Sequence, residues 1–311
     1  MLILLIIMNA LFGLSFTLGK IMLSHGAPLF LVAVRMITSG LVLLGYNVFV
    51  LRNNHMPHRT TWTLYFKQAL FGIFGFYSLR AWGLQFVSSS IAATIFAFFP
   101  LSTALLSWFL RGTRYSATQV FGLLLGCFGI VLIATQGNLC ASTLLSCHPA
   151  TIALILSVIF LSIGIITIEE LVTTHASHPL TINSITMIAG GIFALMTSLA
   201  TEPMWVHGDQ KTLVILLLIQ SVISNCICAN LQAHLLRHYS ATTMSCSSFL
   251  APMSAIIYGT MFLAEPLSWT LLGALCIIIC GIILYHFEHV RSLIRRRISH
   301  QPSSHSEQTP S

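Results

Sequence analysis

Apolar runs of about 20 residues follow one another along nearly the whole chain, and they constrain its fold more than any other feature. Lipid admits only helices or closed barrels as spanning structures, because backbone polar groups must be satisfied internally. Continuous apolar runs favour helices over barrel strands, in which apolar and polar residues alternate. The sequence therefore predicts an all-α integral membrane protein of about ten transmembrane helices. The expected spans are 2–23, 29–50, 64–86, 88–110, 117–136, 150–171, 180–200, 212–236, 242–263 and 268–287.

Charged residues are too few to cover a soluble protein. They make up 7% of the 311 residues, whereas a soluble domain carries roughly a quarter. The N-terminal run begins at Met1 without a basic segment or a small-residue cleavage site, so it is expected to be the first span and not a removed signal. The apolar surface is therefore expected to face a lipid bilayer.

Lys and Arg are distributed unevenly between the loops of the two sides. The loops of one side are expected to hold only Lys211. By the positive-inside rule the richer side is cytoplasmic, which places both termini in the cytoplasm and the chain in the cell inner (cytoplasmic) membrane. Residues 288–311 are then a basic, disordered cytoplasmic tail, so the net charge of +7 does not indicate nucleic-acid binding. The richer side holds Arg52, Arg59, Lys67, Arg111, Arg114, Arg237, Arg291, Arg295, Arg296 and Arg297.

The two halves of the chain match one another at an offset of 151 or 152 residues. Ordered matches at a nearly constant offset indicate an internal repeat. Each unit holds five expected spans, an odd number, so the two units cross the membrane in opposite directions. Such inverted repeats are typical of secondary transporters. The expected domains are 1–140 and 149–287. Matching pairs include Gly13 and Gly164, Pro28 and Pro179, Gly40 and Gly191, Ala81 and Ala233, Pro100 and Pro252, and Gly129 and Gly281.

The order of these motifs resembles the EamA branch of the drug/metabolite transporter superfamily over roughly residues 2–287. The resemblance implies ten helices and a central cavity between two inverted halves. Two positions depart from the family pattern: Thr113 stands where a Glu is usual, and Phe12-Gly13 replaces Trp-Gly. The matching residues are Phe12-Gly13, Pro28, Arg35, Arg80-Ala81-Trp82-Gly83 and Phe99-Pro100, then Pro179-Leu180, Ala233, Ala251-Pro252 and Glu265-Pro266.

Three basic residues, Lys20, Arg35 and Arg80, fall within expected spans. A charge in the hydrocarbon costs about 2.5–3.5 kcal/mol or more, so such residues are candidates for substrate binding. The alternative is that they extend to the outer headgroups. Tyr77 lies on the same helix face as Arg80, so the pair can hold a substrate carboxylate and stack a ring, and Trp82 belongs to the same aromatic-rich span.

Glu169 is an acid at the cytoplasmic end of the sixth span. It is either an interfacial partner for Arg111, Arg114 or Arg237, or an inner-gate group that faces a cationic substrate. Asn183, Asn225, Asn230 and Gln232 either line the cavity or bond helices together.

Pro100 and Pro252 occupy repeat-equivalent positions in spans four and nine. A proline inside a helix removes a backbone hydrogen bond and bends the helix. The pair therefore predicts two hinges, with simple helix packing as the alternative.

The chain lacks a Walker lysine loop and an HExxH motif. His55, His58, His175 and His178 are expected to be solvated loop residues and not metal ligands. We therefore expect no cofactor and no enzymatic activity. Because no acid lies in the middle of a span, exchange of solutes or potential-driven movement is favoured over proton coupling.

The predicted function is alternating-access transport of a small organic metabolite. Within the EamA branch, the chain is most similar to carriers of obligate intracellular bacteria, which implies uptake of S-adenosylmethionine in exchange for S-adenosylhomocysteine. The alternatives are an exporter of amino acids or hydrophobic drugs and, in another class, a lipid flippase or membrane-embedded enzyme. The sequence leaves the oligomeric state open.

Overall fold

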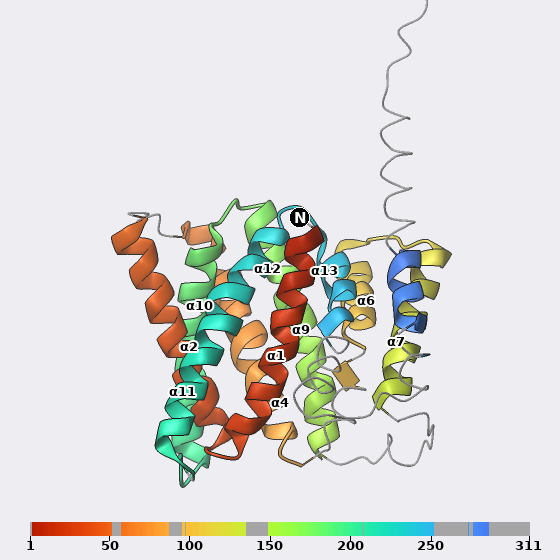
Figure 1. Ribbon diagram of the computed structural model, residues 1–311. Helices are drawn as coiled ribbons and strands as arrows, with labels where there is room; N and C mark the ends of the chain where they lie inside the picture. The colour runs from red at the N-terminus through yellow and green to blue at the C-terminus, as the bar shows by residue number, and fades with distance from the viewer. Residues whose placement is uncertain are drawn as a thin grey trace, which may run out of the picture.

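The computed structural model describes residues 2–51, 57–86, 95–96, 98–134, 149–206, 208–251, 273 and 276–285. Within this part, helices stand side by side in a bundle (Figure 1), and the one β feature is an isolated bridge between Gly26 and Val206. The all-α fold is confirmed. The helices are α1 (Leu2–Leu23), α2 (Pro28–Gly45), η1 (Tyr46–Val50), η2 (Arg59–Thr61), α3 (Trp62–Lys67), η3 (Gln68–Gly75), α4 (Phe76–Gly83), α6 (Phe99–Arg111), α7 (Ala117–Ala134), α9 (Pro149–Thr173), α10 (Pro179–Thr201), α11 (Gln210–Gln220), η4 (Ser221–Cys228), α12 (Ala229–Leu235) and α13 (Ala241–Ser247).

Four helical stretches of the described chain are long and apolar enough to cross a membrane. Their ends lie within two residues of the ends expected for spans two, six, seven and eight. Shorter apolar helices occupy parts of spans one, five and ten, at Ile3–Leu14, Ala117–Gly129 and Cys276–Tyr285. The four long stretches are Pro28–Val50, Pro149–Thr173, Pro179–Thr201 and Gln210–Leu235.

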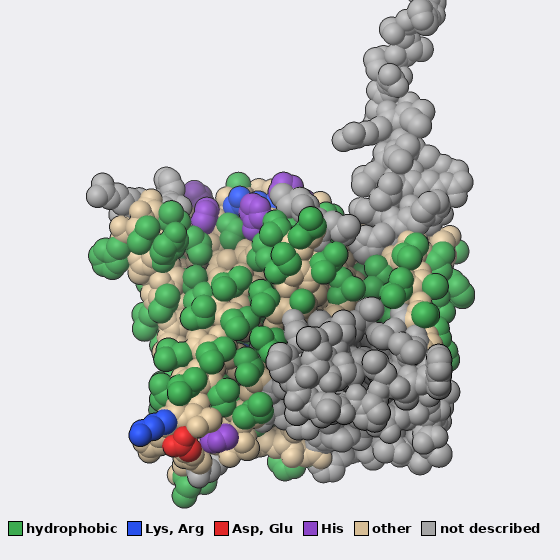
Figure 2. All heavy atoms as spheres, in the orientation of Figure 1, with side chains coloured by type: hydrophobic (Ala, Val, Ile, Leu, Met, Phe, Trp, Pro, Cys, Tyr) green, Lys and Arg blue, Asp and Glu red, His purple; other side chains and the backbone are tan. Residues whose placement is uncertain are grey.

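The flank of the bundle is apolar, and the charged side chains gather at its two ends (Figure 2). Large hydrophobic side chains such as Phe49 and Phe109 are more than three-quarters exposed. A soluble protein does not leave so many large apolar side chains in water, so this flank is the surface that faces lipid.

Spans three and eight each contain a π-helical segment, η3 and η4, which the sequence analysis did not anticipate. Each begins at or next to a buried glutamine, Gln68 or Gln220, and these two residues are 152 positions apart. The Gln68 side chain lies beside Gly72 and Gly164. A third π-helical segment, η1, ends span two. π turns concentrate at functional positions of helices, and those of spans three and eight recur at equivalent places in the two halves.

The most extensive helix contact in the described chain is between α2 and α10, which are repeat-equivalent. A Cβ added to Gly40 would lie 2.7 Å from Cγ1 and 2.9 Å from the backbone N of Ile188. Reciprocally, a Cβ on Gly191 would lie 2.7 Å from Cγ1 and 3.0 Å from the backbone N of Ile37. Both pairs are related by the same 151-residue offset, so the two halves meet across a pseudo-two-fold axis, as in an isologous interface.

The connections at the two ends of the bundle show that the halves are inverted. At one end, here called the far end, the α1–α2 connection meets the α10–α11 connection: the Ala27 N–H donates to the Trp205 carbonyl at 2.9 Å, and the Gly208 N–H donates to the His25 carbonyl at 3.2 Å. At the other end, the basic end, the equivalent pair of segments meets: residues 174–178 lie beside residues 57–61. Equivalent connections therefore lie at opposite ends.

The basic end carries Arg59, Arg111 and Arg237, three exposed cations of the described chain. Arg111 pairs with Glu169 near the end of α9, and Arg237 donates to the Ser177 carbonyl at 3.2 Å. Arg59 opens η2 beside the same loops, and the N-terminus lies at this end in Figure 1. The far end carries Asp209, the N-cap of α11, and Lys211 in the first turn of that helix.

Replacing Gly40 or Gly191 by Ala is expected to lower the free energy of unfolding by about 1–3 kcal/mol, because the new methyl group meets backbone atoms that cannot move aside. The control is Gly45→Ala, where the nearest atom lies 4.0 Å away and the better helix propensity of Ala is expected to leave stability unchanged or raised. Thermal unfolding in detergent measures the difference. Equal melting temperatures for all three variants would contradict the close crossing.

Candidate functional site

Arg35 is a buried cation within the second span. It lies in α2, only 7% of its surface is exposed, and its Cζ sits 4.9 Å from the centre of the Tyr77 ring of α4. The Arg35 Nε is buried and has no hydrogen-bond partner among the described residues. A guanidinium stacked on an aromatic face with an unused buried donor is arranged to receive an acceptor from a ligand.

Arg80 extends this cluster from α4. Its Cζ lies 5.3 Å from the centre of the Phe96 ring and 5.8 Å from that of Phe76. Arg80 is close enough to Arg35 and Tyr77 for electrostatic interaction with both. Phe76 in turn contacts Tyr77 and Phe96, with ring centres 4.5 and 6.2 Å apart. The result is two guanidinium groups set among three aromatic rings.

The energetic balance at Arg35, whose Nε has no partner among the described residues, favours an anion beside it. Placing a cation within the hydrocarbon costs about 2.5–3.5 kcal/mol even on the mildest scale. A desolvated cation–π contact recovers about 2 kcal/mol, and the two like charges also repel each other. A carboxylate between them would supply charge-assisted, bidentate hydrogen bonds of the kind that guanidinium groups prefer.

Asn225 of η4 forms hydrogen bonds with the stretch of α2 that carries Arg35. Asn225 Nδ2 donates to Ser39 Oγ at 3.0 Å and to the Arg35 carbonyl at 3.4 Å, and Ser39 Oγ donates to the same carbonyl at 2.7 Å. Asn183 Nδ2 also donates to Asn230 Oδ1 at 3.0 Å. These asparagines therefore bond helices together, one of the two roles that the sequence left open for them.

The other predicted site residues make contacts of their own or lie outside the described chain. Trp82 contacts Phe86, with ring centres 5.1 Å apart. Glu169 forms an ion pair with Arg111 at the basic end, one of the interfacial partners that the sequence offered. Pro100 lies in the first turn of α6, a position where its missing N–H is of no consequence. The side chain of Lys20 and the whole of Pro252 lie outside the described residues.

Glu202 is an acid with a role that sequence reasoning did not identify. Its carboxylate accepts the N–H groups of Leu29 at 2.8 Å and Phe30 at 2.9 Å, the first free amides of α2. Ser198 Oγ donates to the same carboxylate at 2.5 Å. A carboxylate is favoured at a helix N-terminus by the free N–H groups and by the helix dipole. Glu202 thus fastens the second half to the first at the far end, a pairing across 173 residues that no local pattern reveals.

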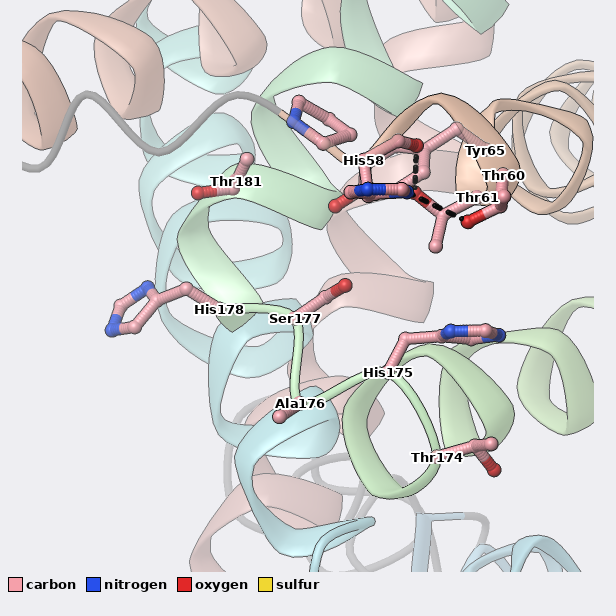
Figure 3. Close-up of a pocket in the computed structure, with 11 residues that line it drawn as sticks. His58, Thr60, Thr61, Tyr65, Thr174, His175, Ala176, Ser177, His178 and Thr181 are labelled. Carbon is pink, nitrogen blue, oxygen red and sulfur yellow. Dashed lines mark hydrogen bonds between the residues drawn. The ribbon is translucent and has the colours of Figure 1, made fainter.

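The basic end carries a pocket of about 670 Å³ between the α9–α10 connection and the segment before α3 (Figure 3). In the close-up, His58, Thr61 and Tyr65 lie across the pocket from Ser177 and His175. From the sequence, His58, His175 and His178 were expected to be solvated loop residues. All three are exposed, and they line this pocket. The groups of His, Cys, Asp and Glu in the described chain include none of three or more that could hold a metal ion. Its lining is Pro57, His58, Thr60, Thr61, Tyr65, Thr174, His175, Ala176, Ser177, His178 and Thr181.

The EamA-like transporter family model matches the chain twice, over residues 1–135 and 148–287. The chain belongs to this family. The double match agrees with the repeat read from the sequence and with the reciprocal contact of α2 and α10. This transporter is therefore an integral membrane protein built of two inverted halves.

Relatives of the transporter are named for transport. It is 30% identical to the S-adenosylmethionine/S-adenosylhomocysteine transporter of Chlamydia muridarum, over 94% of this chain and 93% of the other. The transporter of the same name from Chlamydia trachomatis is 29% identical, over 94% and 90% of the two chains. An uncharacterized transporter of Bacillus subtilis, YvbV, is 26% identical over 88% and 87%.

A protein of known crystal structure shares the fold of the transporter. The two superpose with a TM-score of 0.73 at 17% sequence identity, and the superposition covers 95% of this chain and 97% of the other. At this identity the likeness concerns the arrangement of helices alone.

Replacing Glu202 by Gln in the transporter is expected to lower the free energy of unfolding by about 1–2 kcal/mol, because the neutral amide loses its charge interaction with the start of α2. The matched control is Glu170→Gln, at the C-terminal end of α9, where loss of a negative charge is not expected to destabilise the helix. Thermal unfolding of both variants tests this. A Glu202→Gln protein as stable as the wild type would contradict the capping role.

Proposed function

We propose that the transporter carries a small organic metabolite with a carboxylate group and binds it at Arg35, Tyr77 and Arg80. One observation carries the proposal: a buried arginine in a transmembrane helix is stacked on a tyrosine and keeps an unused buried donor. A substrate carboxylate would satisfy that donor and offset the positive charge. The surrounding rings of Phe76, Tyr77 and Phe96 suit a substrate that also has a flat ring or a cationic centre.

The specific substrate that fits best is S-adenosylmethionine, exchanged for S-adenosylhomocysteine. Both solutes carry an amino-acid carboxylate for the guanidinium groups and an adenine ring for aromatic stacking, and the sulfonium of the former suits an aromatic face. The names of the chlamydial relatives support this choice. An exporter of amino acids would use the same carboxylate contacts, and transport assays separate the two.

Transport requires an orientation in the membrane and units that move against each other. We assign the basic end to the cytoplasm, following the positive-inside rule, with both termini on that side. Lys20 and Trp82 contact the substrate during its passage, Glu169 acts at the inner gate together with its partner Arg111, and Pro252 bends span nine. The units that move against each other are 1–140 and 149–287, and the chain performs transport without enzymatic chemistry.

The proposal is tested in proteoliposomes that contain the purified transporter. Vesicles loaded with S-adenosylhomocysteine are offered labelled S-adenosylmethionine, and parallel sets are offered labelled amino acids. Uptake that depends on the internal solute is expected for S-adenosylmethionine. Absence of uptake of every carboxylate solute, with or without an internal solute, would overturn the proposal.

Arg35→Ala and Arg80→Ala are each expected to reduce uptake at least about tenfold, because each removes a charge-assisted hydrogen bond to the substrate. Arg35→Lys is expected to restore only part of the activity, since an ammonium lacks the planar fork of the guanidinium. Lys211→Ala, an exposed cation at the far end, is the control that keeps wild-type uptake. Normal uptake by the two Ala variants would remove these arginines from the site.

Tyr77 tests the aromatic contribution separately. Tyr77→Phe keeps the ring under Arg35 and is expected to retain most of the affinity, whereas Tyr77→Leu loses the cation–π contact and is expected to bind several-fold more weakly. The apparent affinity for labelled substrate measures the difference. Equal affinity in Tyr77→Phe and Tyr77→Leu would rule out a role for the aromatic ring.

A further inference from the structure

Asn225 of η4 keeps an unused hydrogen-bond acceptor deep in the bundle. The residue is fully buried, and its Oδ1 has no partner among the described residues. Its Nδ2 donates to Ser39 Oγ at 3.0 Å and to the Arg35 carbonyl at 3.4 Å. Because the Ser39 hydroxyl itself donates to that carbonyl, the amide group that meets both must be the donor, and the oxygen is the atom left over. A buried acceptor without a partner costs free energy until a ligand supplies a donor.

This acceptor lies close to the buried cation of α2. Arg35 and Ser39 are four residues apart, so their side chains leave the same face of α2 one turn apart, and Asn225 bonds to Ser39 on that face. Cys226, next to Asn225, and Tyr77, which stacks on Arg35, pack against one hydrophobic cluster. Helix α2 contacts both α4 and η4. The unused donor of Arg35 and the unused acceptor of Asn225 therefore lie at one junction of α2, α4 and η4.

The repeat shows that helix packing does not require these polar groups. Asn225 and Ser39 correspond to Ile73 and Gly190, at offsets of 152 and 151 residues. The corresponding pair is also in contact, since a Cβ added to Gly190 would lie 2.6 Å from Cγ2 and 2.7 Å from Cβ of Ile73. Equivalent spans therefore meet once through polar side chains and once without them.

Arg35 and Tyr77 differ from their counterparts in the same direction. The residue equivalent to Arg35 is Thr186, whose Oγ1 donates to the Ile182 carbonyl of its own helix at 2.8 Å. The residue equivalent to Tyr77 is Ala229. The cation, the ring and the unused acceptor are thus confined to one side of the pseudo-two-fold axis, and a ligand explains them better than packing does.

We propose that Asn225 Oδ1 accepts a hydrogen bond from the α-ammonium group of the substrate, so that the site selects solutes with an α-amino-acid head. In such a head a carboxylate and an ammonium group share one carbon. The carboxylate matches the unused Nε donor of Arg35, and the ammonium matches the unused acceptor of Asn225. This inference rests on the proposed function, because it requires the substrate carboxylate to bind at Arg35. It adds that a carboxylate alone is not enough.

The test separates the two groups of the head. Proteoliposomes that contain the full chain take up labelled S-adenosylmethionine in competition with one of three unlabelled ligands: S-adenosylhomocysteine, its analogue without the amino group, and its analogue without the carboxylate. A parallel set uses labelled methionine with methionine, its des-amino acid and its decarboxylated amine. The concentration that halves uptake measures the affinity of each competitor.

In the wild type, removal of the amino group and removal of the carboxylate are each expected to weaken competition at least about tenfold, as for loss of a charge-assisted hydrogen bond. A site built to bond a substrate N–H rejects the analogue that lacks it, because the buried acceptor is then left unpaired. Asn225→Ala is expected to lose the preference for the amino group and to keep the preference for the carboxylate. Arg35→Ala is expected to show the reverse. A purely structural defect would weaken all three competitors alike and leave these ratios unchanged.

Asn230→Ala is the matched control. Asn230 lies in the same span, and the protein uses both of its polar atoms: Oδ1 accepts from Asn183 Nδ2 at 3.0 Å, and Nδ2 donates to the Cys226 carbonyl at 2.8 Å. This variant is expected to keep both wild-type ratios. Asn225→Asp retains an acceptor oxygen and is expected to keep the preference for the amino group, which Asn225→Ala loses.

The possible results distinguish this inference from the proposed function. A wild type that rejects the decarboxylated ligands but accepts the des-amino ligands would overturn the inference and leave the carboxylate site standing. Wild-type ratios in Asn225→Ala would also overturn it. Equal competition by the decarboxylated ligands, or no uptake in either set, would overturn the proposed function and the inference with it.

Discussion

The close crossing of α2 and α10 is the contact on which the rest of the structure depends. Gly40 and Gly191 bring the two helix backbones together, and each faces an isoleucine of the other helix, Ile188 or Ile37, in reciprocal fashion. Between membrane helices there is little hydrophobic driving force, so association relies on such close packing and on hydrogen bonds between helices. The contact joins the two halves across a pseudo-two-fold axis. It also holds α2, which carries Arg35, in place beside α4.

Symmetry in the backbone contrasts with asymmetry in the side chains. The far end is fastened by Glu202, by the Gly26–Val206 bridge and by stacking of Phe30 on Trp205, with ring centres 5.5 Å apart. The equivalent segments at the basic end enclose a pocket lined by hydroxyls and histidines. In the alternating-access cycle that we propose, the two ends open in turn, although they are related by symmetry and held by different contacts. The side chains of this chain supply that difference.

A buried arginine requires compensation, and the Arg35 Nε has no hydrogen-bond partner among the described residues. Arg35 and Arg80 rest on aromatic rings, and Asn225 and Ser39 hold the backbone of α2 in place. Cation–π contacts recover less than the cost of a charge in hydrocarbon, as the magnitudes given above indicate. The carboxylate of the substrate that we propose would supply an anionic group here. Asn225, which bonds to α2 near Arg35, lies in the π-helical segment η4.

The sequence by itself determined the helical class, the ends of spans two, six, seven and eight, the repeat and the presence of cations within spans. These features follow from local hydropathy and from residue matches at a fixed offset, which need no knowledge of packing. It also placed Tyr77 beside Arg80, because both lie on one helix face. Only the tertiary structure decided that Arg35 of α2 stacks on Tyr77, that Glu202 holds the start of α2 and that the start of α10 opens into a pocket. Each of these joins residues from different helices, and the relative rotation and depth of packed helices are set by side-chain packing that periodicity cannot specify.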